Sequence, residues 1–223
     1  MFVTGVQLGV LPVRVRVADW LVPQSYLDNI ERTADAAHPE QLERATVGRN
    51  SYREIHRRCH QMAAANWVIV EKAVAVTAVI SPIITWEENI AQADALCWEA
   101  STGDSPCIPI TALPANVTKA RRILAGESAL DVIRGPKVWN FYHSILHPEN
   151  PYTVCVDRHV ARAAFGWEYG WRDTDTRLKS PGEYDTVAEA VRRIAKKRGM
   201  RALELQALLW LVMRENPRQL RMF

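Results

Sequence analysis

The chain has 223 residues, with 28 Lys and Arg against 25 Asp and Glu, which gives a formal net charge of +3. Hydrophobic residues make up 48% and charged residues 24%, a balance that is ordinary for a soluble globular protein and indicates neither a disordered chain nor a membrane protein. This length suits one domain or two closely joined lobes. The mildly basic charge permits a polyanionic partner without requiring one, because a local patch matters more than the total.

Neither the first residues nor the cysteines point to export or to a membrane. The first residues, MFVTGVQLGVLPV, are apolar but lack a basic leader segment and are interrupted by Gly and Pro, so we expect no signal peptide and no membrane span. Four widely spaced cysteines contain no C-x-x-C pair, which favours free thiols in a reducing cytoplasm. We expect a cytoplasmic monomer.

Taken in order, the chain begins with an arm and continues as helices. The alternation VRVRV at residues 13–17 suits an extended strand within an N-terminal arm, residues 1–24. Five later segments place an acid three positions after a hydroxyl, a pattern typical of helix starts. They begin at Ser25, Ser51, Thr85, Ser128 and Thr186.

These starts and the apolar periodicity predict an all-α protein of roughly ten short helices. The expected ranges are 26–36, 39–47, 52–65, 67–80, 86–99, 117–125, 129–134, 136–146, 158–165, 186–198 and 201–215. Residues 67–80 are rich in β-branched side chains and would also suit a buried strand, but their length and alanines favour a helix. Residues 167–184 are expected to form a polar connection.

Residues 130–166 contain the features with the clearest chemistry. Gly135 can adopt a positive φ between two helices, and Pro136 suits the first position of the second one. The free N–H groups of that helix start form an anion site, for which a DNA phosphate is one candidate and a simple helix–helix turn is the alternative. Lys137 and Asp157 each begin a helix, and the short loop between these helices should bring both residues to one cleft.

Residues 79–166 resemble the helix-hairpin-helix superfamily of DNA glycosylases, which contains endonuclease III and the oxoguanine glycosylases. VISPIITWEENIAQADAL is similar to the early L-L-S-x-Q segment, with Ser81 on the serine, and NVTKARRILAG is similar to the next helix. LDVIRGPKVW resembles the hairpin L-P-G-V-G-x-K-T-A, and VCVDRHVARAAFG resembles V-D-T-H-V-x-R-x-x-x-R. A weaker similarity points to divergent phage and actinobacterial members linked to modified thymines.

The resemblance implies an all-α fold of two lobes around a cleft, and it implies the removal of a base from DNA. The hairpin lobe is expected at about 81–166, and the second lobe at about 25–80 plus 167–223. Lys137 becomes the nucleophile that attacks the sugar of a flipped nucleotide, and Asp157 the essential carboxylate. The attacking amine must be neutral, so we expect Lys137 to be buried. A lysine Schiff base would also make strand cleavage (AP-lyase activity) accessible.

The same resemblance implies the surrounding site. The expected partner is double-stranded DNA that contains a modified or damaged base, and we expect no metal, no iron–sulfur cluster and no other cofactor. The expected DNA-binding residues are Ser81, Arg134, Gly135, Arg158, His159 and Arg162. The expected pocket residues are Trp139, Asn140 and His143.

Several positions depart from the superfamily pattern and keep two alternatives open. Ile133 replaces the first hairpin glycine, Val138 and Trp139 replace a small Thr-Ala pair, and Pro82 or Ile83 stands where a glutamine fills the gap left by a flipped base. One alternative is a DNA-binding or base-sensing protein without turnover. The other is an enzyme that acts on hypermodified thymine-type bases or nucleotides.

Two further segments are interpreted more simply. The last helix is apolar nearly all round, so Trp210 is expected to fill the core. The basic tract at 192–201 is either the solvated side of a surface helix or a phosphate contact. Its basic residues are Arg192, Arg193, Lys196, Lys197, Arg198 and Arg201.

Overall fold

The computed structural model describes residues 21–48, 50–180 and 182–215, and within them the chain is all-α with no strand. The predicted strand at 13–17 lies outside the described residues. Twelve helices are present in these ranges. They are α1 (Gln24–Asp35), α2 (Pro39–Thr46), α3 (Tyr52–Ala65), α4 (Val70–Ile80), α5 (Trp86–Thr102), α6 (Pro114–Leu124), α7 (Ala129–Val132), α8 (Pro136–Leu146), α9 (Arg158–Phe165), α10 (Trp171–Leu178), α11 (Glu183–Lys197) and α12 (Ala202–Glu215).

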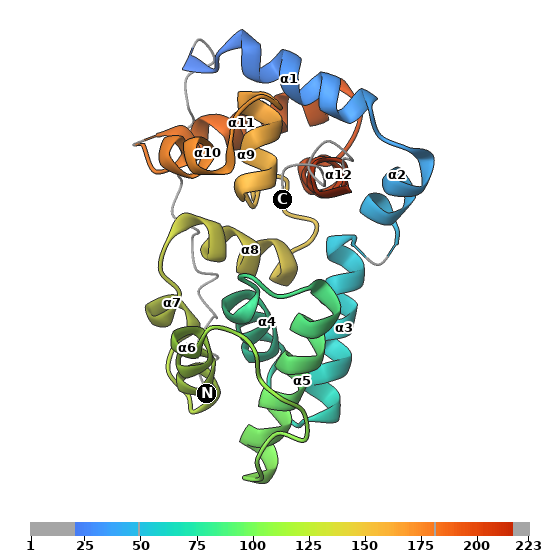
Figure 1. The fold of residues 1–223 in the computed structure, drawn as a ribbon. Coiled ribbons are helices and arrows are strands. Elements are labelled where there is room, and N and C mark those ends of the chain that lie inside the picture. Colours follow the sequence, from blue (N-terminus) through green and yellow to red (C-terminus); the bar gives the residue numbers. More distant parts are fainter. Residues whose placement is uncertain (1–20, 49, 181, 216–223) are drawn as a thin grey trace, which may run out of the picture.

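The helices form two lobes, each around its own core (Figure 1). One lobe is built from the first and the last helices of the described chain. Helices α1, α2 and α9–α12 pack there around a core that contains Ile30, Phe165 and Leu209. The other lobe consists of α3–α8 and buries Ile80, Leu96 and Ile145. The hairpin of α7 and α8 thus belongs to the second lobe, which we call the hairpin lobe, and we call the first the terminal lobe.

The two cores divide the chain differently from the expected boundaries. Helices α3 and α4 pack in the hairpin lobe, although residues 25–80 were expected in the other lobe. Helix α9 packs in the terminal lobe, although the hairpin lobe was expected to extend to 166. The reason is that α4 is buried along nearly its whole length and needs neighbours on all sides, which the hairpin-lobe helices provide.

The predicted helix starts are partly confirmed. The hydroxyls of Ser51 and Thr85 accept the backbone N–H three residues on, and Ser128 accepts that of Leu130. The predictions at Ser25 and Thr186 are wrong: α1 begins after Pro23, and α11 begins after Gly182, so both hydroxyl residues lie inside helices. Either residue fits the local pattern, but a helix start is also fixed by packing further along the chain.

The sequence reasoning missed α10. Its residues, WRDTDTRL, are mostly polar, and only Thr174 is buried, so no apolar periodicity marks the helix. Instead α10 is held by contacts from α9, with the Arg162 guanidinium 4.8 Å and that of Arg158 5.9 Å from the centre of the Trp171 ring. Among the described residues no single helix is long and apolar enough to span a membrane. Helices α3 and α4 have the necessary length and apolarity only when taken together, and the angle between them is 119°.

Candidate functional site

The turn between α7 and α8 holds an open, exposed glycine. Gly135 has φ +87°, as the sequence predicted, and a Cβ built on it would meet nothing within 4 Å. Pro136 follows at the first position of α8, and Lys137 at the second. The backbone at this helix start is therefore accessible to an anion, and Arg134 beside it is also exposed.

Asp157 begins α9 and is held in place from both sides. Its Oδ1 accepts the backbone N–H groups of His159 and Val160, at 2.9 Å and 3.0 Å. The segment before it is anchored to α11 by the Tyr184 hydroxyl, which accepts the Val156 N–H at 3.0 Å and donates to the Val154 carbonyl at 3.1 Å. In the described part of the chain no hydrogen bond ends on Asp157 Oδ2, which leaves one carboxylate oxygen for chemistry.

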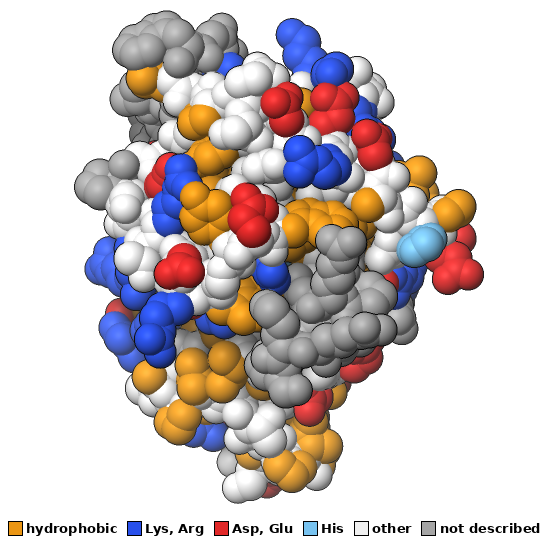
Figure 2. All heavy atoms as spheres, turned by 45° about the horizontal axis from the view of Figure 1, so that its top comes forward, with side chains coloured by type: hydrophobic (Ala, Val, Ile, Leu, Met, Phe, Trp, Pro, Cys, Tyr) orange, Lys and Arg blue, Asp and Glu red, His pale blue; other side chains and the backbone are white. Residues whose placement is uncertain are grey.

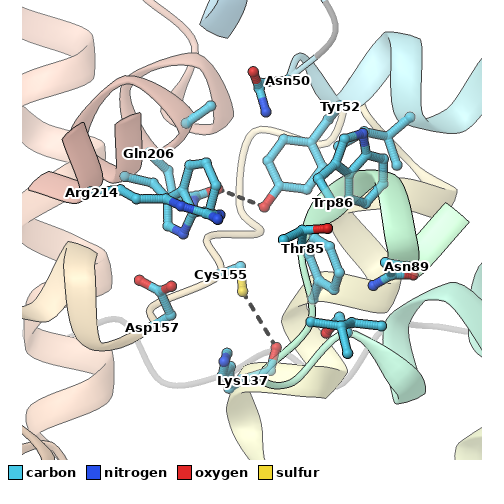
Figure 3. Close-up of a pocket in the computed structure, with 16 residues that line it drawn as sticks. Asn50, Tyr52, Thr85, Trp86, Asn89, Lys137, Cys155, Asp157, Gln206 and Arg214 are labelled. Atoms are coloured by element: carbon cyan, nitrogen blue, oxygen red, sulfur yellow. Dashed lines mark hydrogen bonds between the residues drawn. The ribbon is translucent and has the colours of Figure 1, made fainter. Parts of the chain in front are cut away.

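Lys137 and Asp157 line one pocket of about 140 Å³ between the lobes (Figure 3). The predicted convergence of the two residues is thus observed. Contrary to expectation, Lys137 is exposed, although it lines the pocket from the first turn of α8. Among the described residues that line the pocket, Asp157 is the one acid, and Lys137 and Arg214 are the cations.

Cys155 lies in the pocket wall with these two residues (Figure 3). Its Sγ donates to the Lys137 carbonyl at 3.6 Å, which ties the loop before α9 to the start of α8. Burial raises the pKa of Cys155 to about 12, against the opposing effect of Lys137. The thiol is therefore neutral at physiological pH and acts as a structural hydrogen-bond donor instead of a nucleophile.

The residues predicted to bind DNA are only partly placed for it. Ser81 lines the pocket, with its hydroxyl donating to the Ala78 carbonyl. Arg158 is exposed and lies 3.4 Å from Asp175. His159 is half-buried between Trp171 and Trp210, and burial lowers its pKa, against the opposing effect of Asp157.

The prediction for Arg162 is wrong. This residue is only 5% exposed, and its Nη2 donates to the Trp167 carbonyl at 2.6 Å. Its guanidinium also covers the Trp171 ring, so Arg162 joins α9 to α10 and has no path to a phosphate. The sequence motif placed it on the same helix as Asp157 but could not show which face of that helix is buried.

The three predicted pocket residues of α8 do not line the pocket. Asn140 is buried and donates from Nδ2 to the Pro136 carbonyl at 2.8 Å, and the Trp139 and His143 rings pack together with centres 4.4 Å apart. Phe141 lines the pocket instead. The prediction used the i+3 neighbour of Lys137, whereas the pocket face of α8 follows the i+4 spacing from Lys137 to Phe141.

Sequence reasoning missed the part of the pocket that α12 supplies. Gln206, Trp210 and Arg214 all line it, and they recur every four residues along one face of a mostly apolar helix. Trp210 therefore faces the pocket, and the prediction that it only fills the core is wrong. The polar Gln206 inside ALELQALLWLVMR was the signal that could have revealed this face.

Comparison with known proteins gives a family but no activity. A family model described as a family of unknown function (DUF7178) matches residues 14–217. The chain belongs to the DUF7178 family. Searches of curated proteins and of solved structures find no match. The function of this DUF7178 chain is therefore argued from its own geometry.

The basic tract of this DUF7178 chain is mostly paired with acids. Lys197 lies 2.8 Å from Glu31, Arg198 2.7 Å from Asp35, and Arg201 3.0 Å from Glu149. On the face drawn in Figure 2, Lys and Arg side chains are interspersed with Asp and Glu. These contacts favour the solvated surface helix over a dedicated phosphate contact.

Ile83 is a strained residue beside the pocket of this DUF7178 chain. It has φ +66° and is 78% exposed, in the turn between the pocket residues Ser81 and Ile84. A positive φ after Pro82 is typical of a turn that takes Gly or Asn, and a β-branched residue there is strained. Such strain gathers at functional sites.

We expect Ile83→Gly to raise the free energy of unfolding by about 0.5–2 kcal/mol. Relief of strain, about 1–3 kcal/mol, outweighs the chain entropy that glycine adds, and the exposed side chain loses little packing. Urea denaturation measures the change. The matched control is Val47→Gly, a β-branched residue that is 73% exposed with φ −129°. Val47→Gly should lower the free energy of unfolding by about 0.5–1 kcal/mol. An equal decrease in Ile83→Gly would show that the backbone of Ile83 is not strained.

Proposed function

We propose that this protein is a DNA glycosylase that excises a modified or damaged base, with Lys137 as nucleophile and Asp157 as catalytic carboxylate. The observation that carries the proposal is that these two residues, from helices of different lobes, line one pocket. The resemblance to helix-hairpin-helix glycosylases supports the same pair independently of the geometry. In this reading the two lobes correspond to those that flank the DNA in that superfamily.

The residues divide the chemistry between them. A base that leaves the helical stack enters the pocket, and Asp157 Oδ2 accepts a proton from the Lys137 amine. The amine nitrogen then forms a bond to the anomeric sugar carbon while the glycosidic bond breaks. Its electron pair leaves with the base, which takes up a proton. Asp157 gives its proton to the departing base, so the carboxylate is again negative as the cationic adduct of sugar and amine forms.

A neutral amine at an exposed position requires help from the substrate. Lys137 is exposed and lines the pocket, so a DNA strand laid across the pocket would cover it and remove water. The amine therefore becomes reactive only when DNA is bound, which limits side reactions.

The exposed groups around the pocket suit a duplex. The open backbone at Gly135 and the start of α8 offer N–H groups to a phosphate, and Arg134 adds a charge. Ile83 presents an apolar side chain at the rim, where it can fill the gap left by a flipped nucleotide. Ile83 thereby takes the role for which the superfamily uses glutamine.

Release of free base from duplexes tests the proposal. We expect the wild type to release at least one modified base from a panel of duplexes that each carry a single lesion, and Lys137→Ala to lose the release by about 10²–10⁴-fold. Lys119→Ala, on α6 in the hairpin lobe and not among the pocket residues, is the matched control and should keep full activity. Binding of every duplex without release of any base would favour a base-sensing protein and contradict the enzyme.

A further inference from the structure

Two buried amide side chains line the pocket and have no part in the chemistry proposed above. Asn89 comes from α5 in the hairpin lobe and Gln206 from α12 in the terminal lobe, and they lie on opposite sides of the pocket (Figure 3). They are 2% and 5% exposed. Buried amides usually have hydrogen-bond partners, so the partners of these two show what the pocket is built to hold.

The orientation of Gln206 is fixed by a neighbouring hydroxyl. Tyr52 donates from its hydroxyl to Gln206 Oε1 at 2.6 Å, in a bond that joins the two lobes. The Oε1 acceptor is thereby occupied, and the other end of the amide is Nε2 with two N–H donors. In the described part of the chain Nε2 makes no hydrogen bond, so Gln206 has donors left for a ligand.

The Asn89 side chain has no hydrogen-bond partner in the same part of the chain, although its backbone N–H donates to the Thr85 carbonyl at 2.9 Å. Its Oδ1 is buried and unpaired, and Figure 3 shows its Nδ2 on the side that faces the pocket. The Nδ2 donors on the pocket side are therefore free for an acceptor of a ligand, whereas the buried Oδ1 lacks a donor. The pocket thus presents N–H donors from two opposite sides.

We propose that Asn89 and Gln206 recognise the two carbonyl oxygens of a 2,4-dioxopyrimidine, the class of uracil, thymine and their 5-substituted derivatives. The inference rests on the proposed glycosylase function and adds its substrate class. Carbonyl oxygens on both sides of N3 accept from donors on both sides of the pocket, while Phe141 and Trp210 offer aromatic surfaces for stacking.

The same arrangement disfavours other bases. Cytosine and adenine carry an amino group where a dioxopyrimidine has an oxygen, so a donor would face a donor. A cationic alkylated base would meet amide N–H groups and the positive charges of Lys137 and Arg214, which together outweigh the one carboxylate of Asp157. The pocket therefore selects an uncharged base that accepts hydrogen bonds at two positions.

Single-turnover excision from defined duplexes tests this proposal. The panel is uracil, 5-hydroxymethyluracil and thymine opposite guanine, against hypoxanthine, 8-oxoguanine and 3-methyladenine. We expect excision of at least one dioxopyrimidine and none of the other three bases. Asn89→Leu and Gln206→Met should each slow that excision by about tenfold or more, because each leaves a carbonyl oxygen unpaired. Asn66→Leu, a buried asparagine outside the pocket, should not.

A second readout separates recognition of the base from the chemistry of Lys137. Borohydride trapping on a duplex with an abasic site involves no base, so both amide variants should keep it within about twofold. An equal loss of trapping and excision, or a preference for a purine or a cationic base, overturns the proposal.

If the wild type neither excises nor traps, the proposed function fails instead. Quenching of tryptophan fluorescence by uridine but not by adenosine, weakened in Asn89→Leu, would then still support the recognition. Absence of that selectivity would overturn it.

Discussion

Asp157→Asn should fold nearly as well as the wild type and lose excision by about 10²–10⁴-fold. The asparagine Oδ1 can still accept the N–H groups of His159 and Val160, because Asn and Asp are equally good at a helix start. Only the negative charge is lost, which costs under about 1 kcal/mol of stability through the helix dipole. The carboxylate that would accept the Lys137 proton is gone, so the chemical step fails.

Asp157→Ala removes both the helix cap and the carboxylate that accepts the Lys137 proton. We expect the same loss of excision, together with a fall of about 1–2 kcal/mol in the free energy of unfolding, because two backbone N–H groups lose their acceptor. Urea denaturation and single-turnover excision measure the two effects separately. Full activity in Asp157→Asn would show that the residue is only a helix cap.

Leu209→Ala should have the largest effect on stability, about 2–5 kcal/mol. Leu209 is 0% exposed in the core of the terminal lobe, and truncation leaves a cavity that the surrounding helices cannot close. The expected result in urea is a lower midpoint with an unchanged slope. The matched control is Leu42→Ala in the same lobe, where Leu42 is 42% exposed and should cost under about 1 kcal/mol.

Leu209 also allows the effect on stability to be measured apart from the effect on catalysis. It lies on α12, whose residues Gln206, Ala207, Trp210 and Arg214 line the pocket, but it does not line the pocket itself. Where Leu209→Ala is still folded, its single-turnover excision should therefore match that of the wild type. A loss of excision as large as that of Asp157→Asn would show that the pocket depends on the whole core of the terminal lobe.

Local patterns in the sequence predicted what local physics determines. The all-α class, the capping residues Ser51 and Thr85 and the positive φ of Gly135 each depend on a few neighbouring residues, and the structure agrees with them. The convergence of Lys137 and Asp157 followed from two helix starts joined by a short loop, and both residues line the pocket.

Features set by long-range packing were beyond the sequence patterns. The face of α8 that meets the pocket is decided by how α8 packs on α3 and α4, so Phe141 was missed and Asn140 was wrongly placed. Burial of Arg162 depends on α10, a helix with no apolar periodicity of its own. The pocket wall from α12 lies far along the chain from the other residues.

The most direct test of the central claim is to map the covalent adduct on the protein. The wild type is incubated with the duplex from which it excises a base, or with a duplex that carries an abasic site. The mixture is then reduced with borohydride, and the protein is digested. Peptide mass spectrometry then locates the sugar fragment. We predict a single adduct on Lys137, lost in Lys137→Ala, with no adduct on Lys119. An adduct on another lysine or on the N-terminal amine, unchanged in Lys137→Ala, would contradict the assignment of the nucleophile.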